Sequence, residues 1–397
     1  MGRPQSVKRQ RVALIGNLCD CAVIFGQLLS SEDLEVSIYV SRKELQDSMS
    51  SALRGDKSEE LEERIRRLRT HNPQATIWDH APRLEWMKVL PLGARIVQAI
   101  TFVRLLRELR KADVIVSFAM YHIVSMFSGR PYLAFSTGAD LHEIAMESTT
   151  RGWLMRRAFH RASSVHASYD PVSRENATKL KLQISAPFLI PWEIPAQPAP
   201  FGDREGPINV FMPSRQDWGE PGSSQLAKGN DRFIRAWARR VKEGWASSMI
   251  IVEYGGHVQA TKDLVEELGV AEHVRYVPRL NQSNLQRFIE EADLVADQFD
   301  QGTPGILALQ SMASGRAVSI YWDEFSSLFA YSEIPPVLNG NSEEALYAAL
   351  KACASRQDLQ ARGRAGYEWM TREYGRRKLR EQLRLSVSMV TGVPLGQ

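Results

Sequence analysis

Short runs of β-branched and aromatic residues alternate with helical stretches along most of this chain. Strands that alternate with helices form mostly parallel sheets with helices on both faces. A proline-rich break at residues 191–207 divides the alternation into two series. We therefore predict an α/β fold of two doubly wound, Rossmann-like domains that face each other across a cleft. The predicted strands are residues 11–16, 35–40, 113–118 and 131–136 in the first series, and 208–212, 248–253, 274–277, 293–296 and 317–321 in the second.

The break has the sequence PWEIPAQPAPFGDREGP, with five prolines and two glycines. Proline fixes φ and lacks a backbone N–H, so this segment continues neither a helix nor a central strand. A chain of 397 residues is also longer than one hydrophobic core usually supports. We predict an N-terminal domain at 1–190, a linker at 191–207, a C-terminal domain at 208–361 and charged amphipathic helices at 362–397.

Charge and cysteine content limit the partners and the compartment. The 50 basic and 46 acidic residues give a net charge of +4, which does not indicate a nucleic-acid partner. Cys19, Cys21 and Cys353 form no C-x-x-C pair, which favours a reducing compartment. No signal peptide or transmembrane run is evident, so we expect a cytoplasmic protein. A basic helix at 96–109 leaves peripheral contact with the inner face of the membrane open, although packing on the sheet explains it more simply.

Several common site motifs are missing from the sequence. Gly16 is followed by NLCDCAVIFG, which lacks the G-x-G-x-x-G spacing of nicotinamide-binding domains. There is no Walker A sequence, D-x-D triplet, H-E-x-x-H pair or Cys/His cluster. We therefore expect chemistry that needs neither a protein-bound metal nor another cofactor.

The stretch QGTPGILALQSMASG at 301–315 predicts a loop followed by a helix. Thr303 is a candidate N-cap, Pro304 suits the first helical position and Gly315 suits the C-terminal cap. Gly302 and Gly305 would let backbone amides approach an anion at the helix N-terminus, as a diphosphate requires. A purely structural turn before a helix would use the same residues.

Four segments of the second half follow one another in a recognisable order. They are KGNDRFIRAWARRV, IIVEYGG, LGVAEHVRYVPRL and EEADLVADQFDQGTPGILALQSMASGRAV. This region resembles the C-terminal domain of the retaining GT-B glycosyltransferases, which include many bacterial cell-surface and lipopolysaccharide sugar transferases. In the first half, STGADLHEIA resembles the G-S-D region of the same family.

The resemblance implies a metal-independent, retaining transfer of a sugar from a nucleoside diphosphate, such as UDP, to an acceptor hydroxyl. By resemblance, Arg215 and Lys228 are the basic pair that neutralises the donor diphosphate. Fixed cations stabilise the negative charge that develops on the leaving group. The insertion QDWGEPGSSQLA between them departs from the family spacing, and a solvated lysine at a helix start is the alternative for Lys228. The final helices are expected to cross back onto the N-terminal domain.

The family's paired glutamates align with Gly302 and Gln310, so both carboxylates are absent here. Gln310 could still reach the ribose, because amide groups can replace a charged acceptor. Asp297 and Gln298 form a D-Q pair by which Asp297 could compensate for a missing carboxylate, although capping the next turn explains it equally well.

Five further residues complete the predicted site. Asp140 is the candidate that orients or polarises the acceptor hydroxyl, with a loop-capping role as the alternative. Gly16 and Asn17 are expected to approach the donor phosphate or the acceptor through their backbone amides, and Gly255 and Gly256 are expected to line the floor of the donor cleft.

The sequence therefore predicts a hexosyltransferase whose partners are a nucleotide sugar and a glycan, glycolipid or small-molecule acceptor. A catalytically degenerate GT-B protein that binds a nucleotide sugar or a partner without transfer is the main alternative, because both glutamates are absent. An epimerase of the same architecture would need carboxylates and a histidine in the cleft, which the sequence alone does not identify. A Rossmann-type oxidoreductase lacks its glycine fingerprint.

Overall fold

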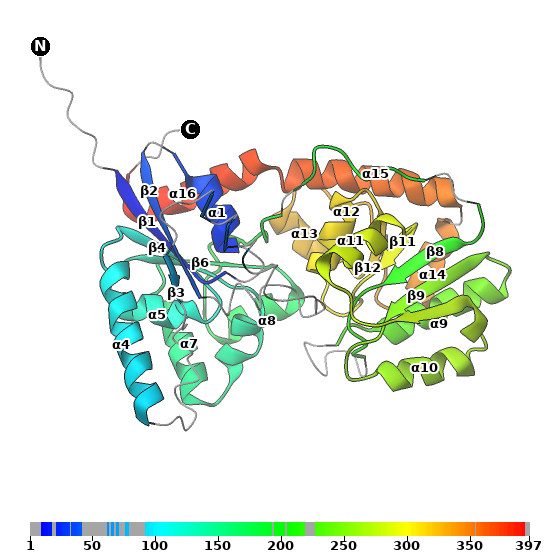
Figure 1. Cartoon of the computed structure of the whole chain (residues 1–397), viewed down its shortest axis with the longest axis horizontal. Coiled ribbons are helices and arrows are strands. Elements are labelled where there is room, and N and C mark those ends of the chain that lie inside the picture. The colour runs from blue at the N-terminus through cyan, green and yellow to red at the C-terminus, as the bar shows by residue number, and fades with distance from the viewer. Residues whose placement is uncertain are drawn as a thin grey trace, which may run out of the picture.

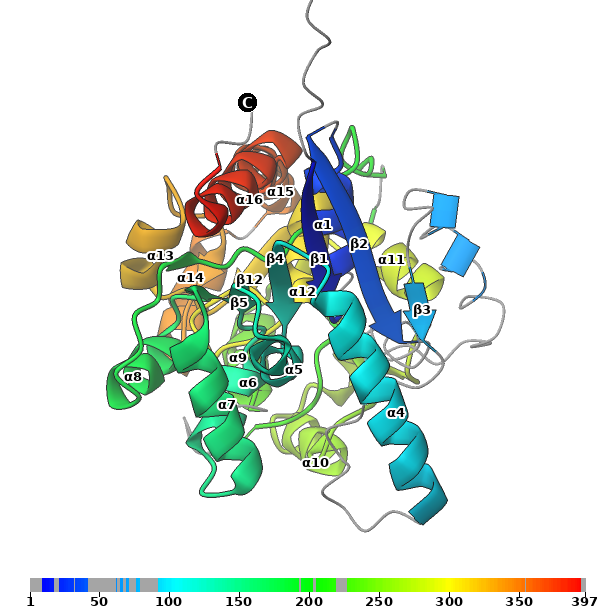
Figure 2. The ribbon, with the colours of Figure 1, turned by 90° about the vertical axis from the view of Figure 1, so that its left-hand side faces the viewer.

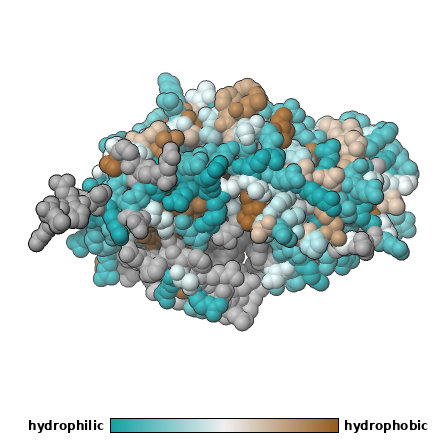
Figure 3. Space-filling view, turned by 90° about the horizontal axis from the view of Figure 1, so that it is seen from above, coloured by the Kyte–Doolittle hydropathy of each residue, from teal (hydrophilic) through white to brown (hydrophobic). Residues whose placement is uncertain are grey.

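The structure is a computed structural model of the chain. It describes residues 9–17, 21–31, 33–41, 62, 65–66, 69–70, 76–78, 92–192, 194–202, 205–218, 227–353 and 355–393. None of the described helices is long and apolar enough to span a membrane. Hydrophilic side chains cover most of the face seen from above, where hydrophobic ones form small separate groups (Figure 3).

The first domain is built on a parallel sheet in which seven strands are described, in the order β3-β2-β1-β4-β5-β6-β7. Its central strand β4 is buried along its whole length, as expected when helices cover both faces. The strands are β1 (Gln10–Ile15), β2 (Leu34–Ser41), β3 (Thr76–Trp78), β4 (Val114–Phe118), β5 (Tyr132–Phe135), β6 (Ser164–Ala167) and β7 (Ala186–Pro187). The helices are α1 (Cys21–Leu29), α4 (Leu92–Leu109), α5 (Tyr121–Ser128), α6 (Ala139–His142), α7 (Thr150–Arg161) and α8 (Pro171–Lys179), with a 3-10 turn at Ile144–Met146.

The second domain repeats this plan with six described parallel strands, in the order β10-β9-β8-β11-β12-β13. Its strands are β8 (Ile208–Met212), β9 (Ser247–Val252), β10 (Val274–Val277), β11 (Leu294–Ala296), β12 (Ala317–Ile320) and β13 (Leu338–Asn339). Its helices are α9 (Asn230–Lys242), α10 (Val258–Glu267), α11 (Gln282–Glu290), α12 (Ile306–Ala313), α13 (Glu324–Ala330), α14 (Glu343–Ala352) and α15 (Arg356–Glu373), with a 3-10 turn at Ala271–His273. The predicted α/β fold of two doubly wound domains is confirmed (Figure 1).

The last helix, α16 (Arg376–Thr391), follows α15 but packs against α1, β4 and β5 of the first domain. Figure 2 shows α16, in red, on the same side of the first sheet as α1. Arg384 of α16 forms an ion pair with Asp33 at 2.6 Å and donates to the Ser31 hydroxyl at 3.0 Å. The chain thus returns to the first domain after completing the second.

One hydrophobic cluster includes side chains from both domains and from the two last helices. Because burial of apolar area is the main favourable contribution to folding, this shared cluster couples the two domains energetically. Its members include Leu133 and Phe188 of the first domain, Leu309 and Trp322 of the second, Trp369 of α15 and Leu383 of α16.

Arg316, between α12 and β12, attaches the linker to the second domain. Its side chain is 1% exposed. The guanidinium donates to the linker carbonyl oxygens of Ala199 at 3.2 Å and Pro200 at 2.8 Å. Its Nε and Nη2 also donate to the Glu290 carbonyl at the end of α11, at 3.1 and 2.8 Å. One buried side chain thereby provides hydrogen bonds to two backbone carbonyl groups of a linker that has no regular secondary structure.

We expect Arg316→Met to lower the free energy of unfolding by about 3 kcal/mol, because it removes the donors to these three carbonyl oxygens. Denaturant unfolding followed by circular dichroism measures the change. Arg377→Met is the matched control, since the Arg377 side chain is 93% exposed and its substitution should cost less than about 0.5 kcal/mol. Equal losses in the two variants would contradict the role given to Arg316.

Candidate functional site

A cavity of about 340 Å³ lies between the two domains. Loops that follow β5, β6 and β7 form its wall on the first domain. Residues that follow β8 and β11, together with the start of α12, form its wall on the second domain. The loops that follow the carboxyl ends of the strands in open α/β sheets are where ligands of such folds bind.

The wall of the second domain brings together two cations and a polar loop. Arg215 and Lys228 both line the cavity. The Lys228 amine donates to Gln298 Oε1 at 2.5 Å, and Gln298 Nε2 donates to the Thr303 carbonyl at 2.6 Å. The Lys228 carbonyl in turn accepts a hydrogen bond from Phe299 N at 2.7 Å. The lysine and the loop after β11 are therefore held together by both side-chain and backbone contacts.

Lys228 is electrostatically coupled to Asp297, which is 2% exposed at the end of β11. Burial lowers the pKa of Lys228, and the negative charge of Asp297 opposes that shift. Burial likewise raises the pKa of Asp297, and the positive charge of Lys228 opposes it. Asp297 Oδ2 has no hydrogen-bond partner among the described residues. The charge of each group therefore offsets part of the cost of burying the other.

Helix α12 starts two residues later than the sequence predicted. Gly305, with extended backbone angles, is the N-cap, and Ile306 is the first helical residue, so Thr303 and Pro304 belong to the preceding loop. The hydrogen bond from Gln298 to the Thr303 carbonyl keeps that part of the loop out of the helix. A Cβ at Gly305 would lie 2.5 Å from Asp297 Oδ2, so only glycine allows the backbone to cross Asp297 this closely.

Gly302 lies where the two domains touch. Its φ is +73°, and a Cβ there would lie 3.0 Å from Asp323 Cβ, 3.2 Å from the Tyr321 ring and 3.3 Å from Pro171 Cδ. Pro171 is the first residue of α8 in the other domain. A side chain at position 302 would therefore be crowded by Asp323 and Tyr321 of the same domain and by Pro171 of α8.

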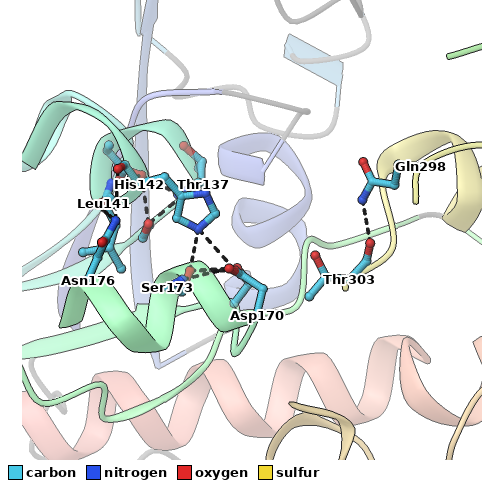
Figure 4. A network of polar contacts seen from close by, with 12 residues as sticks. Thr137, Leu141, His142, Asp170, Ser173, Asn176, Gln298 and Thr303 are labelled. Atoms are coloured by element: carbon cyan, nitrogen blue, oxygen red, sulfur yellow. Dashed lines mark hydrogen bonds and ion pairs between the residues drawn. The ribbon is translucent and has the colours of Figure 1, made fainter. Parts of the chain in front are cut away.

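The wall of the first domain presents a polar network centred on Asp170 (Figure 4). His142 Nε2 lies 3.2 Å from Asp170 Oδ2 and 2.7 Å from Ser173 Oγ. Ser173 donates its backbone N–H to Asp170 Oδ1 at 2.8 Å and its hydroxyl to Oδ2 at 2.6 Å, and the Ser168 hydroxyl also donates to Oδ2. Burial alone would raise the pKa of Asp170, but the hydrogen bonds from His142, Ser168 and Ser173 bring it below its usual value. Asp170 is therefore an ionised, buried carboxylate.

His142, Ser168 and Asp170 line the cavity, and the sequence analysis did not identify them. One signal was available for Asp170. It directly precedes Pro171, and an aspartate followed by proline is a helix-start pattern. No local pattern connects Asp170 with His142, which belongs to α6.

Asp140 does not line the cavity. It is 1% exposed and faces the opposite side of α6 from His142, where its Oδ2 lies 2.9 Å from His122 Nε2. Its Oδ1 accepts hydrogen bonds from the Ser136 hydroxyl at 2.8 Å and from Thr137 N at 3.1 Å. Asp140 thus binds the loop residues Ser136 and Thr137, which line the cavity, without reaching the cavity itself. This corresponds to the loop-capping alternative.

Gly16 and Asn17 also lie outside the cavity lining. Asn17 is fully buried, and its Oδ1 accepts a hydrogen bond from Val23 N at 3.3 Å near the start of α1. Gly16 has φ +89°, and a Cβ there would lie 2.9 Å from the Tyr121 ring. Both residues directly follow β1.

The remaining predicted residues fall into two groups. Gln298, Gly302, Thr303 and Gly305 line the cavity. Gln310 does not, because it is 4% exposed and its Nε2 donates to Gln286 Oε1 on α11 at 2.7 Å. Asp297 lies beneath the loop rather than on its surface. The two other glycines, Gly255 and Gly256, pack against Gln216 and Asp217 beyond the cavity, where Gly256 N donates to Asp217 Oδ1 at 2.5 Å.

No protein-family model matches the chain, and no curated protein matches it. Solved structures do match over nearly its whole length. Sucrose-phosphate synthase from Thermosynechococcus elongatus superposes with a TM-score of 0.59 at 14% identity, covering 97% of this chain and 100% of that one. HepE from Anabaena, solved in complex with UDP-glucose, gives 0.58 at 13% identity, covering 96% and 100%. A structure described as a UDP-N-acetylglucosamine 2-epimerase from Listeria monocytogenes gives 0.51 at 12% identity, covering 98% and 99%. At these identities the likeness concerns the fold, and the predicted GT-B fold is confirmed.

We expect Gly302→Ala to destabilise the protein more than Gly129→Ala. Both glycines have left-handed backbones, with φ of +73° and +72°, which cost an alanine about 1 kcal/mol each. A Cβ at Gly129 meets nothing within 4 Å, whereas one at Gly302 meets Asp323 at 3.0 Å and Pro171 at 3.3 Å. Crowding should therefore add about 1–2 kcal/mol at Gly302, measured by denaturant unfolding. Equal losses would mean that α8 does not press on Gly302.

Proposed function

We propose that this protein is a glycosyltransferase that moves a hexose-type sugar from a nucleoside diphosphate sugar to an acceptor hydroxyl. The observation that carries the proposal is the meeting of Arg215, Lys228 and the loop before α12 in one cavity between two Rossmann-like domains. Two cations beside a glycine-rich helix start are suited to a diphosphate. HepE, which has the same fold, was solved with UDP-glucose, and this supports a UDP-sugar as the donor.

The proposed reaction retains the configuration at the sugar C1 atom. The bond from C1 to the phosphate oxygen breaks, and its electron pair leaves with the diphosphate. The acceptor oxygen forms the new bond on the same face of C1, and its proton passes to an oxygen of the departing phosphate. The role of Lys228 and Arg215 is to stabilise the negative charge on the diphosphate in a site with little water.

This scheme asks for no carboxylate nucleophile and no protein-bound metal. The absent glutamates at Gly302 and Gln310 therefore do not exclude transfer. Gln310 would need to exchange its contact with Gln286 for one with the ribose. We further propose that the acceptor is a glycan, glycolipid or small molecule that reaches the cavity from the cytoplasm or from the inner face of the membrane.

A specific observation favours an epimerase as the second candidate. His142, Glu143 and Asp170 line the cavity, which supplies the histidine and carboxylates that such chemistry would need. One of the structures with this fold is described as a UDP-N-acetylglucosamine 2-epimerase. An epimerase would convert UDP-N-acetylglucosamine to its epimer without an acceptor, which proton NMR of the incubated sugar nucleotide detects. A transferase would leave the configuration of the unreacted donor unchanged.

Titration with UDP, GDP, ADP and dTDP by calorimetry tests the donor site. We expect one nucleotide to bind with micromolar affinity, and Lys228→Ala to weaken that binding at least about tenfold, because a charge-assisted contact with phosphate is lost. Lys242→Ala, at the exposed C-terminal end of α9, is the control and should leave the affinity unchanged.

The two possible failures of this titration have different meanings. If no nucleotide binds the wild type, the proposed function is wrong. If Lys228→Ala binds as tightly as the wild type, the diphosphate does not lie against this wall.

The proposed donor site should bind its nucleotide equally well with excess EDTA and with Mg²⁺, because Lys228 and Arg215 carry the compensating charge. The same calorimetric titration in the two buffers measures this. An affinity that collapses in EDTA would show that a metal ion completes the site.

A further inference from the structure

The cavity has two walls of opposite electrostatic character. The wall of the second domain carries Arg215 and Lys228, whereas the wall of the first domain carries Glu143 and the ionised Asp170. A diphosphate is attracted to the first pair and repelled by the second. If the proposed function holds, the uncharged sugar that follows the diphosphate is the part of the donor that can lie against Asp170 and its partners.

The network around Asp170 is organised before any ligand binds. Ser173 donates its hydroxyl to Asp170, so Ser173 Oγ accepts from His142, and this requires the proton on His142 Nε2. Asn176 Nδ2 donates to the His142 carbonyl at 3.0 Å, which fixes the backbone of α6 against α8. Side chains whose positions are already fixed lose little entropy when they bind a ligand.

Contacts between the domains hold this network against the loop of the second domain. Pro171 lies against Gly302, and Arg174 of α8 forms an ion pair with Asp323 at 2.9 Å. The ring of Tyr169 stacks on that of Phe329 in α13 at 5.2 Å. Figure 4 shows Asp170, His142 and Ser173 on one side and Gln298 with Thr303 on the other. A ligand held by the loop with Gln298 and Thr303 therefore has the Asp170 network as its neighbour across the cavity.

We propose that His142 and Ser168 bind hydroxyl groups of the donor sugar, and that Asp170 is the positioning residue that holds both of them. Both side chains line the cavity and both contact Asp170 Oδ2. His142 directs its Nε2 proton toward Asp170 and Ser173, and Ser168 gives its hydroxyl proton to Asp170, so toward a sugar hydroxyl both side chains act as acceptors. The inference rests on the proposed function, because it needs a sugar nucleotide in this cavity. It places the recognition of the sugar on the first domain, opposite the cations of the second.

The test separates binding of the sugar from binding of the nucleotide. The probes are UDP, or the nucleotide that binds best in the titration above, and its glucose, galactose and N-acetylglucosamine conjugates. Calorimetry gives the affinity of each probe for the wild type and for His142→Phe, His142→Gln and Asp170→Asn. Asparagine at position 170 can still cap α8, so this variant removes the charge and keeps the helix start. His160→Gln, at an exposed position of α7, is the matched control.

We expect His142→Phe and Asp170→Asn to weaken the preferred conjugate about tenfold or more, and the nucleotide alone by less than about twofold. His142→Gln should recover part of the loss, because its amide can donate to Asp170 and still contact a hydroxyl. His160→Gln should bind every probe as the wild type does.

Three results would overturn the inference. Unchanged affinity of every conjugate in His142→Phe and Asp170→Asn would mean that the sugar lies elsewhere, while the proposed function would stand. Equal weakening of nucleotide and conjugate, together with a lower melting temperature, would give the network a structural role only. A wild type that binds no nucleotide would contradict the proposed function itself, and this inference with it.

Discussion

The close approach of Pro171 to Gly302 is one of the contacts through which the two domains meet, beside the Arg174–Asp323 ion pair and the shared hydrophobic cluster. Helix α8 begins at Pro171, and the absence of a side chain at Gly302 lets that helix end approach the loop after β11. Asp170 caps the same helix end, so the close approach also carries its carboxylate to the cavity. A larger residue at 302 would crowd Asp323, Tyr321 and Pro171, the residue that follows Asp170. Gly302 thus allows the helix end that carries the Asp170 carboxylate to approach the second domain.

Strand alternation, the proline-rich break and the resemblance were sufficient to predict the architecture, because they depend on local patterns. The side chains that face the cavity could not be predicted in the same way. Asp140 and His142 belong to the four-residue helix α6 and are two positions apart, so they point about 200° apart around its axis. The sequence offered the aspartate as the site residue, but only the packing of α6 against α5 and α8 decides that His142 faces the cavity.

The start of α12 was misplaced for a similar reason. Thr303 and Pro304 form a good N-terminal helix signal, yet Gln298 binds the Thr303 carbonyl and extends the loop to Gly305. The competing hydrogen bond comes from Gln298, which the sequence analysis assigned to the separate D-Q pair. Gln310 shows the same limit, since its amide pairs with Gln286 of the neighbouring helix α11. In both cases a side-chain hydrogen bond to another part of the chain overrides the structure that the local sequence pattern predicts.

The charges of the half-buried Lys228 and the buried Asp297 affect how this site binds an anion. An ionised carboxylate beneath the start of α12 would oppose a diphosphate bound there. Burial raises the pKa of Asp297, and this lowers the free-energy cost of protonating it as an anion approaches. Lys228 would then exchange its attraction to Asp297 for an attraction to phosphate, so its charge remains compensated in both states. Asp297 therefore acts on Lys228 through its charge from beneath the loop, whereas Gln298 is the residue that contacts the Lys228 amine directly.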